Sequence, residues 1–562
     1  MRQFSPDEQY DMLLKTHAHV FHSVIRNSCT NSTSIRSSVS VPIRFHTQLL
    51  RSMSSSITHH SSAIHPSQPD SIKQSQQIAA DNRFPPVFSN SHHNYSPTLQ
   101  NALTHLDSLI DWERQSRVVG QQRQMRVDSK PCQTLLHHLN NPHHSLQSIH
   151  ITGSKGKGSV STLMESALRK CGKRTGWIRS PHVVRITERI GINGHEINDD
   201  LLGNAIMKSM EAKYECEKLH SVIGKCMTWF DVLTAAGFLA MRDMNVEWAV
   251  VEVGMGGERD STNVLYSPVS IITNIYLEHA DIIGPTRADI ACEKAGIIHA
   301  NAVCITSVDK NDREVATPIE NRVKQTKNAR LVYVESGKNI SIRDENVCTA
   351  RTAWKEMLAA GLLTESEYHN GLLDDAHCEK ALKQLIGRAE TLLVRNREFV
   401  QVPFLVDGAH VAESVYRVIH EVCQSNEAVD LKLIVIVAVG REKDSKGISK
   451  SILSVDSVCD VICTQIGTEK PYLSSREMYD TLNQVQSEMN LNRNVNVYEE
   501  MNVQNAVEVA LKLTESTSAS SHRHFIRENL SNKTKTMIIG IGSLHLIGKL
   551  RPMLASKTKT IE

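Results

Sequence analysis

Apolar residues recur along this chain in two alternating patterns, short unbroken runs and runs at helical spacing. Residues 98–112 carry leucine and isoleucine at intervals of three and four, which predicts an amphipathic helix. Short apolar runs predict strands near 149–152, 248–253 and 269–275, with helical stretches at 160–171 and 288–298. Strands that alternate with helices in this way indicate a parallel sheet with helices on both faces.

A second alternating series begins near Phe399, after a more polar, helical stretch over residues 305–385. Its predicted strands are 404–406, 433–439, 461–465 and 537–541, and a closing helix follows. The sequence therefore predicts two α/β domains that meet near residue 390, over 96–388 and 389–562, with a site between them. The Ser/His/Asn-rich segment 514–535 is expected to be a surface loop.

Composition excludes several classes of function. The chain holds 63 Lys and Arg against 61 Asp and Glu, a net charge of +2, so no nucleic-acid surface is expected. The longest apolar runs, such as 433–439, are too short to cross a bilayer, and no membrane partner is expected. The 12 cysteines include no CxxC pair, which favours reduced intracellular thiols over a disulfide framework or a zinc site.

The N-terminal tail, residues 1–95, has a composition of its own. No Asp or Glu occurs between Met12 and Pro69, where basic residues lie among abundant Ser, Thr and His. This composition is typical of a transit peptide to mitochondria or another organelle, although acidic residues before Met12 spoil the pattern. A disordered Ser/His-rich tail on a cytoplasmic protein is the alternative.

The segment Thr152–Ser159, TGSKGKGS, joins a predicted strand to a predicted helix and is the strongest chemical signal in the chain. Its glycines allow backbone N–H groups to close around phosphate oxygens, and the helix N-terminus adds positive potential. Lys157 can neutralise the β- and γ-phosphates. The spacing differs from the common P-loop, because only two residues separate Gly153 from Gly156, and an ordinary Gly/Lys-rich turn is the alternative.

Further candidates follow the predicted strands. Glu252 ends a strand before a glycine turn, where a carboxylate can bind a hard cation such as Mg²⁺ beside phosphates; a cap or salt-bridge role is the alternative. His279 follows the next strand, at the carboxyl edge of the sheet where ligands bind. Lys294 lies on the following helix, where a lysine is ordinarily a solvated charge.

Several motifs, taken in order, resemble the folylpolyglutamate synthase/dihydrofolate synthase branch of the Mur ligases. They are TGSKGKGS, SPH (180–182), ERI (188–190), ING (192–194), FDVLTAAG (230–237), VEVGMGGERDSTN (251–263), EKAGI (293–297), DGAH (407–410) and GSLHLIG (542–548). The resemblance runs from about residue 97 to the C-terminus. It implies a P-loop central domain of the Mur-ligase type and a smaller Rossmann-like α/β C-terminal domain.

The resemblance assigns roles to individual residues. Catalysis would involve Lys157, Lys294 and His279. ATP would be bound by Gly156, Lys157, Gly158, Ser159, Arg388, Asp407 and His410. The Mg²⁺ ligands would be Ser180, Glu252, His279 and Lys294, the last carbamylated by CO₂. The pterin-bearing substrate would be held by Thr228, Phe230, Arg259, Asp260 and Ser261. A monovalent cation is a further implied cofactor.

The activity implied is an ATP-dependent ligation of L-glutamate to dihydropteroate or tetrahydrofolate, by a protein expected to be a monomer. ATP would convert a carboxylate to an acyl phosphate, which the glutamate amine would then attack. The segment 277–298 resembles dihydrofolate synthases and bifunctional members more than animal polyglutamate synthases. Three alternatives remain: a P-loop kinase or NTPase, a cell-wall Mur ligase, and an inactive pseudo-ligase that binds folate or nucleotide.

Overall fold

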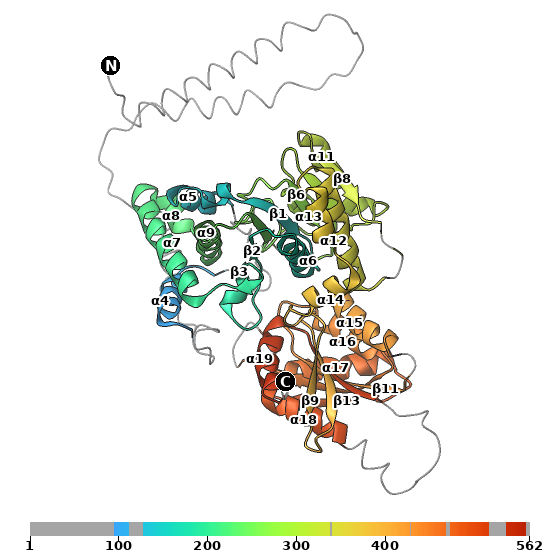
Figure 1. Ribbon diagram of the computed structural model, residues 1–562. Coiled ribbons are helices and arrows are strands. Elements are labelled where there is room, and N and C mark those ends of the chain that lie inside the picture. The colour runs from blue at the N-terminus through green and yellow to red at the C-terminus, as the bar shows by residue number, and fades with distance from the viewer. Residues whose placement is uncertain are drawn as a thin grey trace, which may run out of the picture. The chain divides into compact units, whose positions relative to one another are not determined.

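Two β-sheets, each covered by helices on both faces, carry the fold (Figure 1). The computed structural model describes residues 95–111, 128–280, 282–335, 337, 340–426, 429–467, 472–515 and 535–557. The tail predicted over residues 1–95 lies outside these residues except for Tyr95, and so does most of the loop predicted over 514–535. The first lobe denotes the elements from α4 to α14, and the second lobe those from β9 to α19.

The sheet of the first lobe has eight strands in the order β4-β3-β2-β5-β1-β6-β7-β8. Its strands are β1 Gln147–Thr152, β2 Thr175–Ile178, β3 Ile190–Ile192, β4 His195–Glu196, β5 Trp248–Glu252, β6 Val269–Ile272, β7 Val303–Thr306 and β8 Arg330–Tyr333. The six neighbouring strands β2-β5-β1-β6-β7-β8 pair in parallel. The remaining two, β3 and β4, form an antiparallel hairpin at the β2 edge. The carboxyl ends of the parallel strands therefore meet at one edge.

Side chains that alternate along these strands explain why helices cover both faces. On β5, Ala249 and Val251 pack in one apolar cluster, whereas Trp248 and Val250 pack in another on the opposite face. The first cluster is covered by α4 Pro97–Leu106, α5 Lys130–His138, α7 Asp199–Leu219, α8 Ser221–Cys226 and α9 Trp229–Asp243. The second is covered by α6 Lys157–Lys170, α12 Ile342–Ala359, α13 Glu365–Asn370 and α14 Asp375–Leu382. Beyond β6, helices α10 Arg287–Ala295 and α11 Arg313–Gln325 pack on Ile272 and Cys304.

The sheet of the second lobe has six strands in the order β13-β12-β11-β14-β10-β9. Its strands are β9 Glu390–Arg395, β10 Gln401–Val406, β11 Leu431–Val437, β12 Val458–Thr464, β13 Asn496–Glu500 and β14 Lys535–Ile541, all parallel except β9. Alternate residues of β11 again face different layers. Val435 meets α15 Ala412–Gln424, α16 Ser445–Leu453 and α17 Ser475–Met489, and Ile434 meets α18 Val503–Glu515 and α19 Leu544–Ala555.

The structure confirms the predicted class, an α/β fold of parallel sheets with helices on both faces. Several elements end before their predicted ends, among them α10, which was predicted over 288–298 and ends at Ala295. The helix predicted over 98–112 is α4, which ends at Leu106, and residue 112 lies outside the described part. The strand predicted over 269–275 ends at Ile272, and the next two side chains hydrogen-bond the glycine-rich turn. The boundary predicted at residue 388 stays a prediction.

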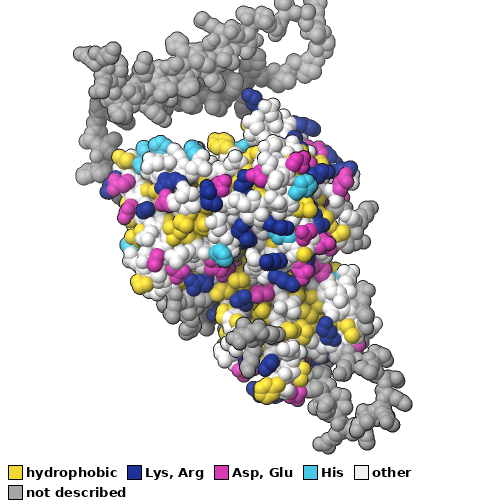
Figure 2. Space-filling view, in the orientation of Figure 1, with side chains coloured by type: hydrophobic (Ala, Val, Ile, Leu, Met, Phe, Trp, Pro, Cys, Tyr) yellow, Lys and Arg dark blue, Asp and Glu magenta, His cyan; other side chains and the backbone are white. Residues whose placement is uncertain are grey.

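Charged side chains of both signs are interspersed over the visible surface (Figure 2), as the near-zero net charge predicts. Within the described ranges, no helix is both long and apolar enough to cross a membrane. The cysteines in these ranges carry free thiols.

Candidate active site

A glycine-rich turn joins β1 to α6, and its glycines are required by the geometry. Gly156 has a φ of +86°, and a Cβ there would lie 2.1 Å from Oδ1 of Asn346. Gly153 has a φ of +142°, and its Cβ would lie 1.8 Å from Oγ1 of Thr273. Lys157 is the first residue of α6, and its Nζ donates to the Gly153 carbonyl at 2.7 Å. The turn thus presents a helix N-terminus and a lysine, which together favour an anion.

This turn forms part of a cavity of about 840 Å³ that is lined by residues of both lobes. All but one of the predicted site residues line it. They are Gly156, Lys157, Gly158, Ser159, Ser180, Thr228, Phe230, Glu252, Asp260, Ser261, His279, Lys294, Arg388, Asp407 and His410. Residues more than 250 positions apart in the sequence therefore meet in one space large enough for a nucleotide and a second substrate.

Arg259 is the predicted residue that does not line the cavity. Its Nε donates to Oε2 of Glu293 at 2.9 Å, and its backbone N–H donates to Oε1 of the same carboxylate at 3.0 Å. The guanidinium is thereby tied to α10, next to Lys294. Its predicted contact with the substrate stays a prediction, and the structure gives it a supporting position.

Glu252 ends β5 beside the glycine-rich turn. Its Oε2 accepts from the backbone N–H of Ser180 at 3.4 Å and lies 3.7 Å from where a Cβ on Gly158 would be. Burial raises the pKa of Glu252, and the charges of Lys157 and Arg388 act in the opposite direction. A buried carboxylate near a serine hydroxyl and a phosphate-binding turn offers oxygen donors of the kind that Mg²⁺ prefers.

Lys294, on α10, is fully buried beside a carboxylate that the sequence did not single out. Its Nζ lies 3.6 Å from Oε1 of Glu278, and burial lowers the pKa of Lys294 to about 8 although the Glu278 charge opposes this. Burial acts to raise the pKa of Glu278, but the charges of Lys294 and Lys157 outweigh it and bring that pKa to about 2. The neighbouring His279 has a φ of +52°, a region that few residues other than glycine adopt, and it lines the cavity.

The side chains predicted to bind a metal ion determine which kind of ion the site can hold. Within the described part of the chain, no group of three or more His, Cys, Asp or Glu side chains is placed to hold a metal ion. The predicted metal set supplies one carboxylate, one imidazole, one hydroxyl and one amine. It fits a hard cation if phosphate oxygens complete the shell and if the amine of Lys294 is neutralised or modified, because an ammonium repels a cation.

The predicted substrate residues are organised by a buried carboxylate, Asp231, which sequence reasoning missed. Thr228 caps α9, and its hydroxyl donates to Oδ2 of Asp231 at 2.7 Å. Ser261 donates to Oδ1 of the same carboxylate at 2.6 Å. Asp260 accepts from the backbone N–H of Met255 at 2.9 Å and so shapes the turn after β5. These side chains therefore form a rigid wall, and the capping pattern T-x-x-D around Thr228 is the sequence signal that could have identified Asp231.

The second lobe contributes the DGAH turn at the end of β10. Asp407 accepts from the backbone N–H groups of Ala389 and Ala409, each at 2.7 Å, so its carboxylate fixes both the inter-lobe connection and its own turn. Burial raises the pKa of Asp407, and the Arg388 charge opposes this shift. Nδ1 of His410 lies 2.7 Å from the Gly408 carbonyl. The bonds of the Asp407 carboxylate and the contact between His410 and the Gly408 carbonyl together hold the turn in one shape at the cavity wall.

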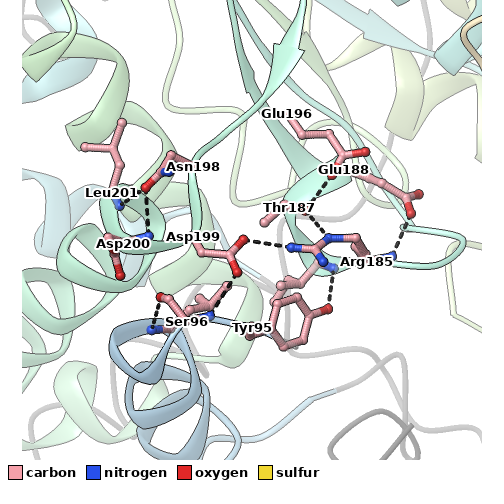
Figure 3. Close-up of polar contacts among 12 residues, drawn as sticks. Tyr95, Ser96, Arg185, Thr187, Glu188, Glu196, Asn198, Asp199, Asp200 and Leu201 are labelled. Atoms are coloured by element: carbon pink, nitrogen blue, oxygen red, sulfur yellow. Dashed lines mark hydrogen bonds and ion pairs between the residues drawn. The ribbon is translucent and has the colours of Figure 1, made fainter. Parts of the chain in front are cut away.

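A carboxylate outside the predicted set holds the loop that follows Ser180 (Figure 3). Glu188 lies in the short 3-10 helix η2, Ile186–Arg189, and accepts from the backbone N–H groups of Val183, Val184 and Arg185 at 2.7, 2.8 and 2.6 Å. Sequence reasoning noted Glu188 only as part of a motif. Three charge-assisted bonds to consecutive amides make it the anchor of this loop.

The same loop is held at its far end by the first described residues of the chain (Figure 3). Arg185 donates to Oδ1 of Asp199 at 2.8 Å and lies over the ring of Tyr95, 4.9 Å from its centroid. The backbone N–H of Ile186 donates to the Tyr95 hydroxyl at 3.1 Å, and that of Ser96 donates to Oδ2 of Asp199 at 3.0 Å. The start of the described chain is thus fastened to the loop that leads to Ser180.

The loop also contacts the second lobe. Val183 is only 8% exposed and packs among apolar residues of that lobe, including Ile547 on α19. A Cβ on Gly548 would lie 2.2 Å from the Val183 carbonyl oxygen, so only glycine allows this approach. The residue pair explains why a glycine stands within α19 at that position.

A comparison with protein families finds a match to the Mur ligase middle domain over residues 151–356. Among curated proteins, the dihydrofolate synthetase of Saccharomyces cerevisiae is 33% identical over 305 residues, which cover 49% of this chain and 67% of that protein. Two other curated relatives are matched over less than half of their length, 41% in one and 34% in the other.

Two solved structures share the fold. The Mycobacterium tuberculosis folylpolyglutamate synthase complexed with ADP and AMPPCP superimposes with a TM-score of 0.61 at 24% identity, covering 76% of this chain and 95% of that chain. A bifunctional folylpolyglutamate synthase/dihydrofolate synthase with Mn, AMPPNP and L-glutamate bound gives a TM-score of 0.60 at 18% identity, covering 82% and 98%. These likenesses extend over both lobes.

Proposed function

This chain belongs to the folylpolyglutamate synthase/dihydrofolate synthase family, and from that premise we propose that it ligates L-glutamate to a folate-type carboxylate with ATP. One observation carries the proposal: the phosphate-binding turn of the first lobe and the DGAH turn of the second lobe line the same cavity. A kinase or NTPase needs the first feature but not the second. Membership of the folate branch also excludes a cell-wall ligase, which leaves an inactive relative as the competing candidate.

Lys157 and the backbone N–H groups at the start of α6 would bind the triphosphate and neutralise charge on the phosphoryl group as it moves to the substrate carboxylate. Lys157 must then exchange its bond with the Gly153 carbonyl for one with a phosphate oxygen. The neutral amine of glutamate would attack the acyl carbon, the acyl C–O bond would break, and the leaving phosphate would take up the one proton that the amine nitrogen loses. Arg388 would face the phosphates from the inter-lobe connection, and lobe contact would exclude water from the acyl phosphate.

Ser180, Glu252 and His279 would hold Mg²⁺, which when bound supplies positive charge to the phosphate oxygens. We further propose that Lys294 is carbamylated. Its lowered pKa, about 8, leaves part of the amine neutral near neutral pH, and a neutral amine adds to CO₂ with loss of one proton. The product is an anion, which removes the repulsion between the lysine and the cation. A monovalent cation is proposed from the family resemblance alone.

Thr228, Phe230, Asp260 and Ser261 would line the pterin side, with Arg259 behind them. The yeast relative is a dihydrofolate synthetase, which supports dihydropteroate as one substrate, and tetrahydrofolate is the other candidate. We propose a monomer from the family resemblance alone. We propose that the tail, residues 1–95, directs the protein to mitochondria or another organelle, with the cytoplasm as the alternative.

The test is ligation by the purified chain with ATP, Mg²⁺ and radiolabelled glutamate, offering dihydropteroate and tetrahydrofolate in parallel. The expected result is label in a folate product, with one phosphate released per amide formed. Label with dihydropteroate alone would identify a dihydrofolate synthase, and label with tetrahydrofolate alone a folylpolyglutamate synthase. Absence of label with both substrates, while nucleotide still binds, would refute the proposal and favour the inactive relative.

A further inference from the structure

We propose that Lys155 is a positioning residue that links the phosphate-binding turn to the second lobe through His410. Its Nζ lies 3.3 Å from Nε2 of His410, across the cavity and 255 positions away in the sequence. Lys155 lines the cavity, yet neither its spacing in the turn nor its motif distinguished it from an ordinary turn residue. The inference rests on the proposed ligase function for its kinetic consequences but not for its structural ones.

The backbone of Lys155 is fixed, which sets the direction of its Cα–Cβ bond. Its N–H donates to Oδ1 of Asn274 at 2.8 Å, and its carbonyl accepts from Oγ1 of Thr273 at 2.6 Å. Both partners follow directly on β6, at the carboxyl edge of the sheet. A lysine held at both backbone groups loses less freedom when its amine binds across the cavity.

His410 is oriented to accept the bond. Its Nδ1 lies 2.7 Å from the Gly408 carbonyl, which can only accept, so Nδ1 carries the proton and Nε2 presents a lone pair. Burial lowers the pKa of His410 well below its usual value, and the charge of Lys155 acts in the same direction. The imidazole therefore stays neutral, and the ammonium of Lys155 is the donor.

The surroundings make this contact sensitive to an anion. Burial lowers the pKa of Lys155 to about 8, and the nearby positive charges of Lys157, Arg388 and Lys443 add to this effect. Four cationic side chains thus face this space, where the carboxylates of Glu278 and Asp407 interact favourably with the charge of Lys155. A bound triphosphate would supply the missing negative charge and hold the ammonium of Lys155 in place. The link to His410 should consequently tighten when nucleotide binds.

A second chain of contacts runs from the same turn to the same part of the second lobe. Asn274, which binds the Lys155 backbone, donates from Nδ2 to Oε1 of Glu345 on α12 at 3.3 Å. Glu345 pairs with Arg417 on α15 at 3.7 Å, and Arg417 also donates to the Tyr276 hydroxyl at 3.3 Å. Since His410 lies two residues before the start of α15, both routes end on one segment. Residues 407–424 are thus the part of the second lobe that should respond to the phosphates.

The experiment compares Lys155→Met with Lys155→Arg, which keeps a donor, and with Lys157→Met, which removes the phosphate-binding lysine. Hydrogen exchange of residues 407–424 is measured with and without a non-hydrolysable ATP analogue, alongside its dissociation constant and the ligation kinetics. We expect the analogue to protect this segment in the wild type and in Lys155→Arg. Lys155→Met should lose the protection while its affinity for the analogue changes by less than about 5-fold and kcat falls by about 10-fold or more.

A double-mutant cycle isolates the pair. If Lys155 acts through His410, adding His410→Leu to Lys155→Met should lower kcat/KM little further, whereas independent roles would multiply the two losses. His410→Gln, which keeps an acceptor, serves if His410→Leu does not fold. The inference is overturned if Lys155→Met keeps the protection, if the two losses multiply, or if analogue affinity falls as far as in Lys157→Met. A wild type that protects 407–424 but ligates nothing would instead refute the proposed function alone.

Discussion

Replacing Glu188 tests whether one carboxylate holds the loop behind Ser180. Oε1 accepts from the amides of Val184 and Arg185, and Oε2 accepts from that of Val183. In Glu188→Gln, one oxygen can keep its two bonds, but the new NH₂ group faces the third amide. One lost charge-assisted bond and one unsatisfied amide predict a cost of about 2 kcal/mol. In Glu188→Ala all three amides lose their partner, and the cost should reach about 4 kcal/mol.

The measurement is hydrogen exchange of residues 181–190, because local opening reports the loop even if the two lobes do not unfold together. Glu188→Gln should accelerate exchange of these amides by about 30-fold, the equivalent of about 2 kcal/mol. Glu196→Gln is the matched control: its carboxylate accepts at 2.5 Å from the Thr187 hydroxyl in the same cluster (Figure 3) but from none of the three amides. Equal exchange in wild type, Glu188→Gln and Glu196→Gln would refute the anchoring role.

Three further predictions follow from single contacts. Lys157→Ala should abolish ATP-dependent ligation with little change in thermal stability, and near-normal ligation would contradict the phosphate-binding role. His150 is buried, and burial lowers its pKa from 6.5 to about 3, so the unfolded chain takes up a proton at a higher pH than the folded chain does. The free energy of unfolding should therefore fall as the pH drops below 6.5, by about 2 kcal/mol at pH 5. In His150→Asn, denaturation measured at several pH values should show a weaker dependence of this free energy on pH over that window. Gly156→Ala should weaken binding of an ATP analogue at least 10-fold in a calorimetric titration. Adding Asn346→Ala should recover only part of this loss, because the clash is relieved but the φ of +86° remains; full recovery would show that backbone strain is negligible.

Much of the fold could be predicted because apolar periodicity records burial on both faces of a parallel sheet. On β11, unbroken apolar residues predicted a strand covered on both sides, and alternate side chains do pack in separate clusters. The antiparallel hairpin of β3 and β4 was not predicted, since strands of three and two residues leave too short a pattern. The end of β6 was missed because the side chains of Thr273 and Asn274 hydrogen-bond the backbone of Lys155 in the glycine-rich turn, and no pattern in the neighbouring sequence indicates these bonds.

The site divides in the same way. Motif residues such as Lys157 and Glu252 were identifiable because their chemistry follows from a glycine-rich turn and a strand end. Glu278 and Lys155 were not, because each acquires its importance from a partner elsewhere in the sequence, whereas Asp231 was missed although a local capping pattern with Thr228 marks it. Arg259 shows the converse. A motif position suggested a substrate contact, whereas the structure pairs the guanidinium with Glu293 on α10.

The close approach of the Val183 carbonyl to Gly548 has a consequence for engineering by recombination. A hybrid that takes its C-terminal portion from a distant relative would need a glycine at this one position of α19. Any larger residue there would push against the peptide that leads back to Ser180, so the mismatch would reach the catalytic edge of the other parent. The two portions are therefore not freely interchangeable parts, and crossover libraries should keep 180–188 and 544–555 from the same source.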